Sequence, residues 1–229
     1  MGKRQESRER IEAAIIEIGR QHLVTEGAAG LSLRAIARDL GMVSSAVYRY
    51  VASRDELLTL LVVDAYTELA DAVDGAATQS DWRARIRAIA HATREWAIDQ
   101  PARWALLYGS PVPGYHAPAE RTVGPGTRVV GALFAAVAAG IAAGDITTAK
   151  EAVAQPLSSD LDHIRAEFDF TGDDGVVAKC FLVWAALVGA VSLEVFGQYG
   201  ADTLTDPGQM FELQIGLLID TLARPVHQS

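Results

Sequence analysis

The chain has 229 residues, of which 50% are apolar and 21% charged, with 20 glycines and 8 prolines; this composition predicts a folded soluble protein and excludes collagen-like, low-complexity and wholly disordered chains. Its one cysteine, Cys180, excludes a disulfide-rich secreted scaffold and a cysteine-rich zinc module, and favours a reducing cytoplasm. The net charge is −9, but residues 1–54 carry +3 and the remainder −12. This uneven distribution of charge is typical of a protein that binds a polyanion at one end. The alternative is that basic residues cluster by chance on a solvated face.

Helical periodicity dominates the chain, and we expect an all-α fold. The N-terminal part predicts helices over residues 8–25, 33–40, 44–50 and 53–75. Glycines mark the expected ends of the first two, at Gly27 and Gly41. The expected caps are serines: Ser32, then Ser44 or Ser45, and finally Ser53, which forms a capping box with Glu56.

Longer and more apolar helices are predicted beyond Gly75, which places the domain boundary in or just before the long linking helix. We expect a helix-turn-helix domain over residues 1–54 and a helical domain over residues 55–229. The helices predicted in the second domain cover residues 81–99, 101–108 and 121–143, short pieces around Lys150 and Ile164, and residues 175–199 and 207–222.

The sequence predicts neither a membrane span nor a secretory signal. No run without a charged residue is longer than that of Val129–Gly144, which has 16 residues, fewer than the roughly 20 that a membrane helix needs. Residues 1–12 are charged throughout and precede no apolar stretch with a small-residue cleavage site. We therefore expect a cytoplasmic protein without a membrane partner.

The segment Leu31–Val51 has the pattern of a helix-turn-helix. Ala37 lies four residues before Gly41, where a larger side chain would push the second helix away, and Gly41 can adopt the positive φ of the turn. Val47 is placed to point back towards the first helix of the pair. A structural helical turn without DNA is the alternative.

The second short helix exposes small residues near its start, followed by aromatic and basic ones. Such a helix can approach base edges in the major groove, while hydroxyls and backbone N–H groups bind phosphates. Arg34 can bind guanine bidentately; Arg54 is a phosphate anchor or else a solvated surface charge. Tyr48 and Tyr50 are either DNA contacts or partly core. The candidate DNA-contacting residues are Ser32, Arg34, Ser44, Ser45, Ala46, Tyr48, Arg49, Tyr50 and Arg54.

Residues 8–61 resemble the DNA-binding domain of the tetracycline-repressor (TetR) family of bacterial transcriptional regulators. The resemblance rests on LSLRAIARDLGM, on SSAVYRYV and on SRDELL, in the family's order and spacing. It implies that Tyr48, Tyr50 and Arg54 contact the DNA backbone, although the family usually has histidine where Tyr50 stands and lysine where Arg54 stands. It also implies that Ser44, Ser45 and Ala46 are the variable base-reading positions.

The C-terminal part resembles in part a subgroup of that family with a Trp-x-x-His-Gly signature. The matching segment is Trp184-Ala-Ala-Leu-Val-Gly189, which lacks the histidine and has Val188 before the glycine. Only the domain type is implied by this resemblance, and no ligand residue is carried over.

Aromatic side chains of the C-terminal part can form the walls of an apolar pocket for an unidentified small apolar effector, with histidines as polar orienting groups. Each of these residues is more often a core side chain than a ligand contact. The histidines form no cluster with the spacing of metal ligands, and the sequence has no phosphate loop or nucleophile motif. We therefore expect no metal, no cofactor and no catalytic residue. The candidate ligand-binding residues are His91, Trp104, Tyr108, Phe134, His163 and Trp184.

The last two predicted helices are apolar over more of their circumference than a two-layer monomer needs, so we expect them to bind a partner. A two-fold homodimer with a four-helix bundle would bury this surface and place two reading helices roughly 34 Å apart. The resemblance implies the same arrangement. The candidate interface residues are Phe181, Val188, Phe211, Ile215 and Leu218.

These observations predict a homodimeric, ligand-responsive transcriptional regulator, most simply a repressor, that binds a near-palindromic operator in double-stranded DNA through residues 32–54. Two alternatives stay open. One is a helical small-molecule carrier or enzyme that keeps the helix-turn-helix only as scaffold. The other is an architectural DNA-binding protein without an effector.

Overall fold

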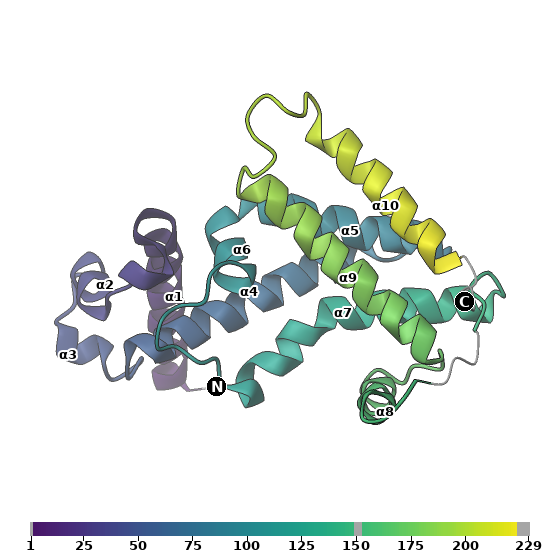
Figure 1. Ribbon diagram of the computed structural model, residues 1–229. Coiled ribbons are helices and arrows are strands. Elements are labelled where there is room, and N and C mark those ends of the chain that lie inside the picture. Colours follow the sequence, from purple (N-terminus) through teal and green to yellow (C-terminus); the bar gives the residue numbers. More distant parts are fainter. Residues whose placement is uncertain (1, 149–152, 224–229) are drawn as a thin grey trace. The chain divides into compact units, whose positions relative to one another are not determined.

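The computed structural model describes residues 2–148 and 153–223, and every regular element in these ranges is a helix (Figure 1). The expected all-α class is therefore confirmed. The piece predicted around Lys150 lies outside the described residues, whereas the one around Ile164 is present. The helices are α1 Lys3–Gly30, α2 Leu33–Asp39, α3 Ser44–Val47, α4 Arg54–Ala76, α5 Trp82–Asp99, α6 Pro101–Tyr108, α7 Ala119–Ala142, α8 Leu157–Glu167, α9 Asp174–Val195 and α10 Pro207–Ala223.

Glycines in the left-handed region set several helix ends. In α1 the helical conformation breaks at Gly27, which has φ +67°, and a last turn then continues to Gly30. The helix α9, predicted to reach Tyr199, ends at Val195 because Gly197 adopts φ +65° and its N–H bonds back to the carbonyl of Glu194. A substituted residue would be strained at either glycine.

The helix α3 is shorter than predicted, because it ends at Val47 rather than Tyr50. Its N-cap is Val43 and not a serine, and the side chain of Ser32 at the start of α2 makes no cap hydrogen bond. The cap predicted at Ser53 is confirmed, since its Oγ accepts a hydrogen bond from the N–H of Glu56 at 3.1 Å.

The chain forms two compact units. The first comprises residues 1–68 and 100–126, and the second comprises residues 69–99 and 127–229. The boundaries fall within α4, just before α6 and within α7, so residues 100–126 belong with the N-terminal helices. The predicted domain boundary after residue 54 concerns where the DNA-binding part ends, and it stays a prediction.

The first unit has its core under the predicted helix-turn-helix. Ile15, Ile36, Val47, Val51 and Leu57 are each fully buried there, on α1, α2, α3, the segment after α3, and α4. Apolar contacts of this kind are the main stabilising term for a small helical domain. The two short helices, α2 and α3, therefore have fixed positions within this unit.

The second unit is built around α5, α9 and α10, which pack on one another (Figure 1). A paired charge joins two of these helices, because the guanidinium of Arg94 on α5 donates two hydrogen bonds, of 2.8 and 2.6 Å, to Glu194 on α9. Aromatic rings gather near α7, where Phe134 lies with its ring centroid 4.8 Å from that of Phe168 and 4.9 Å from that of Phe170.

Candidate nucleic-acid interface

The turn between α2 and α3 has the geometry that the sequence predicts. Gly41 adopts φ +66°, and the N–H of Met42 donates to the carbonyl of Ala37 at 2.8 Å. A Cβ at Gly41 would meet open space, so it is the backbone conformation and not crowding that requires glycine there. Ala37 is 1% exposed and Val47 fully buried, which seats α3 against α2.

The opposite side of α3 and the residues after it face solvent. Ser45, Tyr48 and Arg49 are exposed, and Arg34 on α2 is exposed as well. Ser44 and Ala46 are half-buried. Small residues therefore begin the helix, and a phenol and a guanidinium follow at its end.

Two other candidates, Tyr50 and Ser32, are half-buried within the first unit. Tyr50 is half-buried against the core, with the guanidinium carbon of Arg8 5.8 Å from its ring centroid. Ser32 is half-buried at the start of α2. Tyr50 is therefore partly a core residue, which is one of the two interpretations that the sequence left open, and part of its side chain remains accessible.

Arg54 has a structural role that sequence reasoning missed. Its Nη2 donates to the carbonyl oxygens of Ala28 and Ala29 at 2.9 and 3.0 Å. These carbonyls belong to the last turn of α1, where a helix leaves acceptors without intrahelical donors. The side chain remains 34% exposed, so a phosphate contact stays a prediction beside this capping role.

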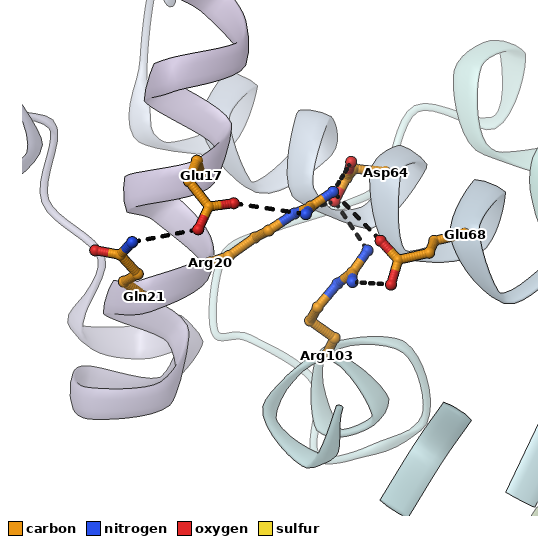
Figure 2. Close-up of polar contacts among 6 residues, drawn as sticks. All are labelled: Glu17, Arg20, Gln21, Asp64, Glu68 and Arg103. Atoms are coloured by element: carbon orange, nitrogen blue, oxygen red, sulfur yellow. Dashed lines mark hydrogen bonds and ion pairs between the residues drawn. The ribbon is translucent and has the colours of Figure 1, made fainter. Parts of the chain in front are cut away.

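A charged cluster joins α1, α4 and α6 within the first unit, as Figure 2 shows. Arg20 on α1 binds Asp64 on α4 through two hydrogen bonds of 2.6 and 2.9 Å, and lies 3.4 Å from Glu68. Arg103 on α6 donates to Asp64 at 3.0 Å and to Glu68 at 2.6 Å. Hydrogen bonding to Asp64 raises the pKa of Arg20.

The exposure of the members of this cluster differs strongly. Arg103 is 4% exposed, whereas Asp64 is 21% and Glu68 40% exposed. Burying a guanidinium is costly unless carboxylates pair with it, and two carboxylates one helical turn apart on α4 supply that pairing. The cluster therefore fixes α1 to α4 and α6 with a defined geometry.

Residues after α6 fasten to the same core. Val112 and Tyr115 pack against it from the loop that precedes α7, and the hydroxyl of Tyr115 lies 3.1 Å from Oγ1 of Thr59 on α4. At the start of α7, Nη1 of Arg121 donates to both carboxylate oxygens of Glu56 at 2.9 and 2.8 Å. The segment over residues 100–126 thus supports the reading helices as part of one unit.

The structure divides the six candidate ligand residues between the two units. Trp104 and Tyr108 lie together in the first unit, with ring centroids 4.3 Å apart. Trp104 is fully buried, and burial raises the pKa of Tyr108. These two residues form an aromatic pair in the interior of that unit.

The other four candidates lie in the second unit. Phe134 is 1% exposed and belongs to its aromatic core, whereas His163 is exposed on α8. Trp184 is half-buried on α9. Nε2 of His91 lies 2.7 Å from a carboxylate oxygen of Glu212, and the histidine side chain is 40% exposed. His91 and His163 are thus surface residues, and an effector pocket built from all six residues stays a prediction.

The predicted interface needs a correction on α10. Phe211 and Ile215 are each 2% exposed and face the interior of their own unit, whereas Leu213 and Leu217 are 61% and 57% exposed. The helical period of 3.6 residues places these two pairs on opposite faces. Both faces of α10 are apolar, so its periodicity alone does not show which of them is buried within its own unit.

An apolar groove lies between α9 and α10 in the second unit. It has a volume of about 380 Å³. Of the predicted interface residues, Leu218 lines it, Val188 is half-buried nearby on α9, and Phe181 is 40% exposed. We call it the α9–α10 groove; its lining residues are Ala186, Gly189, Ala190, Leu193, Tyr199, Gln214, Leu217 and Leu218.

Two of the described helices, α7 and α9, are long and apolar enough to cross a membrane. Length and composition alone are weak indications, because core helices of soluble proteins meet the same criteria. In the second unit α9 packs on α5, α8 and α10. Its contacts with three other helices are those of a packing helix of this unit.

Comparison with known proteins identifies close relatives. Residues 86–218 match the family model described as tetracyclin repressor-like, C-terminal domain. HTH-type transcriptional regulators from Mycobacterium bovis and Mycobacterium tuberculosis are 65% identical to the chain over 226 residues, which are 97% of the chain and 97% of each relative.

Solved structures agree with these matches. A structure described as that of a regulatory protein has a TM-score of 0.77 at 32% identity, and the match covers 96% of this chain and 100% of that one. A TetR family transcription regulator from Marinobacter aquaeolei has a TM-score of 0.62 and covers 98% of this chain and 100% of that one; at 18% identity it shows the fold alone. The resemblance seen in residues 8–61 is thus confirmed, and the molecule is a transcriptional regulator rather than an enzyme: the chain belongs to the tetracycline-repressor (TetR) family.

Proposed function

We propose that the protein binds a near-palindromic operator as a homodimer and represses transcription until a small apolar effector releases it. The observation that carries this proposal is the two-sided character of α3. Its Val47 is fully buried against the core, while its other side presents small and hydroxyl-bearing residues to solvent. A helix anchored in this way can enter the major groove without losing its own packing.

The proposed DNA contacts are divided by chemistry. Ser44, Ser45 and Ala46 approach base edges, where small side chains allow the backbone to come close. Arg34 contacts guanine, and Ser32, Tyr48, Arg49, Tyr50 and Arg54 contact phosphates, for which their hydroxyl and guanidinium donors are suited. The arginines would neutralise phosphates and release the counterions bound to them. The affinity for DNA should therefore fall steeply as the salt concentration rises.

The proposed dimer forms through the α9–α10 groove, whose lining includes Leu193 and Leu217, and through the exposed Leu213. Leu193, Leu213 and Leu217 are between 38% and 61% exposed, which is an unfavourable surface to leave in water. A two-fold axis would bring the same groove of each protomer together and bury it. Two copies of α3 would then read two half-sites of one operator.

Effector binding is proposed to favour a dimer in which the two reading heads do not match successive major grooves. The candidates remain His91, Trp104, Tyr108, Phe134, His163 and Trp184. Because a ligand shifts an equilibrium only by its differential affinity for two states, operator DNA must weaken effector binding by the same factor by which effector weakens DNA binding. We place this activity in the cytoplasm, with no membrane partner.

The test is DNA binding by fluorescence anisotropy, using the DNA upstream of the protein's own coding sequence and a shuffled duplex of equal composition, at about 0.15 M salt. We expect the upstream DNA to bind at least about 1000-fold more tightly. Ser45→Glu places a carboxylate on the exposed side of α3 and should lower the affinity by at least about 100-fold. The control Ala166→Glu, at an exposed position of α8, should leave the DNA affinity unchanged. Equal binding of both duplexes would reject the proposal.

A further inference from the structure

Val43 is an exposed apolar residue beside the proposed base-reading positions. It is the N-cap of α3 and is 70% exposed. It is not among the candidate contacts drawn from the sequence. Its surroundings nevertheless indicate a contact outside the chain.

The local structure of α3 gives no reason for a valine at this position. Serine, threonine, aspartate and asparagine are the favoured N-cap residues, because their side chains accept a hydrogen bond from the first free N–H groups. Val43 has the extended conformation of a cap, with φ −70° and ψ 141°, but no side-chain cap bond. Threonine has nearly the same shape and would supply that bond. The valine therefore gives up a local stabilisation.

The neighbours of Val43 direct its side chain outwards. Met42 is half-buried and packs against the core of the first unit, held by the bond from its N–H to the carbonyl of Ala37. Val43, by contrast, is 70% exposed, so its side chain faces solvent rather than that core. Ser44 and Ser45 follow with short side chains, which leaves the isopropyl group prominent at this edge of α3.

We propose that Val43 contacts the 5-methyl group of a thymine in the major groove and thereby helps to set the operator sequence. Among the groups that base pairs present in that groove, the thymine methyl is the apolar one. A valine cannot bind phosphate and gains from excluding water against a methyl group. This inference rests on the proposed function, because it requires α3 to lie in the major groove.

The experiment first selects an operator from random duplexes with the full-length protein. Each thymine of the selected operator is then replaced by deoxyuridine, which removes only the methyl group. We expect one thymine position, present once in each half-site, to respond. Each replacement there should lower the affinity of the wild-type protein by about fourfold, which is the effect of losing one buried methyl contact. With Val43→Ala the same replacement should have almost no effect.

Two further variants separate this contact from general changes. Val24→Ala alters an equally exposed valine, 74% exposed on α1, and should keep the full sensitivity to deoxyuridine. Val43→Thr keeps the shape of the side chain and restores a cap, and should reduce the sensitivity while leaving the thermal midpoint equal or higher. Circular dichroism checks that each variant is folded.

The outcomes distinguish the inference from the function on which it rests. If the wild type selects no sequence at all, the proposed function fails and the inference with it. If it selects an operator but no thymine position responds to deoxyuridine, or if Val43→Ala retains the full response, the inference fails while the proposed function stands. Loss of the response in Val43→Ala alone supports the inference.

Discussion

Replacing Arg103 by methionine tests whether the charged cluster of the first unit holds its helices together. Methionine retains much of the apolar stem of arginine and removes its charge. The loss of one partner from a fully buried ion pair costs about 3–5 kcal/mol. Here Asp64 and Glu68 are 21% and 40% exposed and retain Arg20 as a partner. We therefore expect a cost of about 2 kcal/mol, below that range.

Hydrogen exchange measured by mass spectrometry is the suitable assay, because it reports the two units separately. Peptides from α1, α4 and α6 should exchange about 30-fold faster in Arg103→Met, the factor that corresponds to 2 kcal/mol. Arg128→Met is the matched control: Arg128 also pairs with two carboxylates, Asp71 and Asp74, but its side chain is 37% exposed. Such a surface network contributes about 0–1 kcal/mol. Equal effects of the two variants would refute the reasoning from burial.

Further predictions concern the second unit. Leu217→Asp should give folded monomers in sedimentation velocity, whereas Phe211→Asp should lower the thermal midpoint by unfolding its own core; a dimer unaffected by the first would contradict the proposed interface. Burial raises the pKa of Cys180 to about 12, so its thiol should resist alkylation at pH 8 in the native protein and react fully in urea, and rapid native labelling would argue against its burial. Hydrogen bonding to His91 lowers the pKa of Glu212, so the stabilisation from this pair is fully present above the ordinary pKa of the carboxyl group and is lost as the pH falls from there through the lowered pKa of the folded protein. The thermal midpoint of Glu212→Gln should accordingly differ from wild type at pH 6 and converge with it once the pH is low enough to protonate Glu212 in the folded protein, whereas a pH-independent difference would speak against the pair.

The fold was largely predictable because each helix has its own local signals. Apolar residues at helical spacing, Gly27 and Gly41 at turns, and Ser53 at a cap all act over a few residues. The pattern of Ala37, Gly41 and Val47 was sufficient to predict the turn before α3 for the same reason. Helix ends were less predictable, as α3 shows, because the last turn depends on what packs beneath it.

Contacts between distant segments could not be predicted from local signals. Arg20 and Arg103 lie far in the sequence from each other and from the carboxylates of Asp64 and Glu68, and nothing in the local patterns indicates that these residues meet. Arg54 resembled a phosphate anchor, but its bonds to the end of α1 require knowledge of where that helix stops.

The choice between two apolar faces was equally inaccessible to sequence reasoning. Phe211 and Leu217 on α10 are similar in hydrophobicity, yet one is buried in its own unit and the other is exposed. Which face turns inwards depends on the positions of α5 and α9, which the periodicity of α10 alone does not contain. The Val43 side chain was overlooked for a related reason, since its exposure appears only once Met42 is seen to pack on the core.

Methylation interference on a selected operator tests most directly whether α3 reads DNA as one of a pair. Methylation of guanine N7 blocks the major groove without breaking the base pair. We expect binding to be blocked at two symmetry-related positions on one side of the duplex, in major grooves about one helical turn apart. Interference confined to a single groove, or none at any guanine while the protein still binds specifically, would contradict reading by two copies of α3.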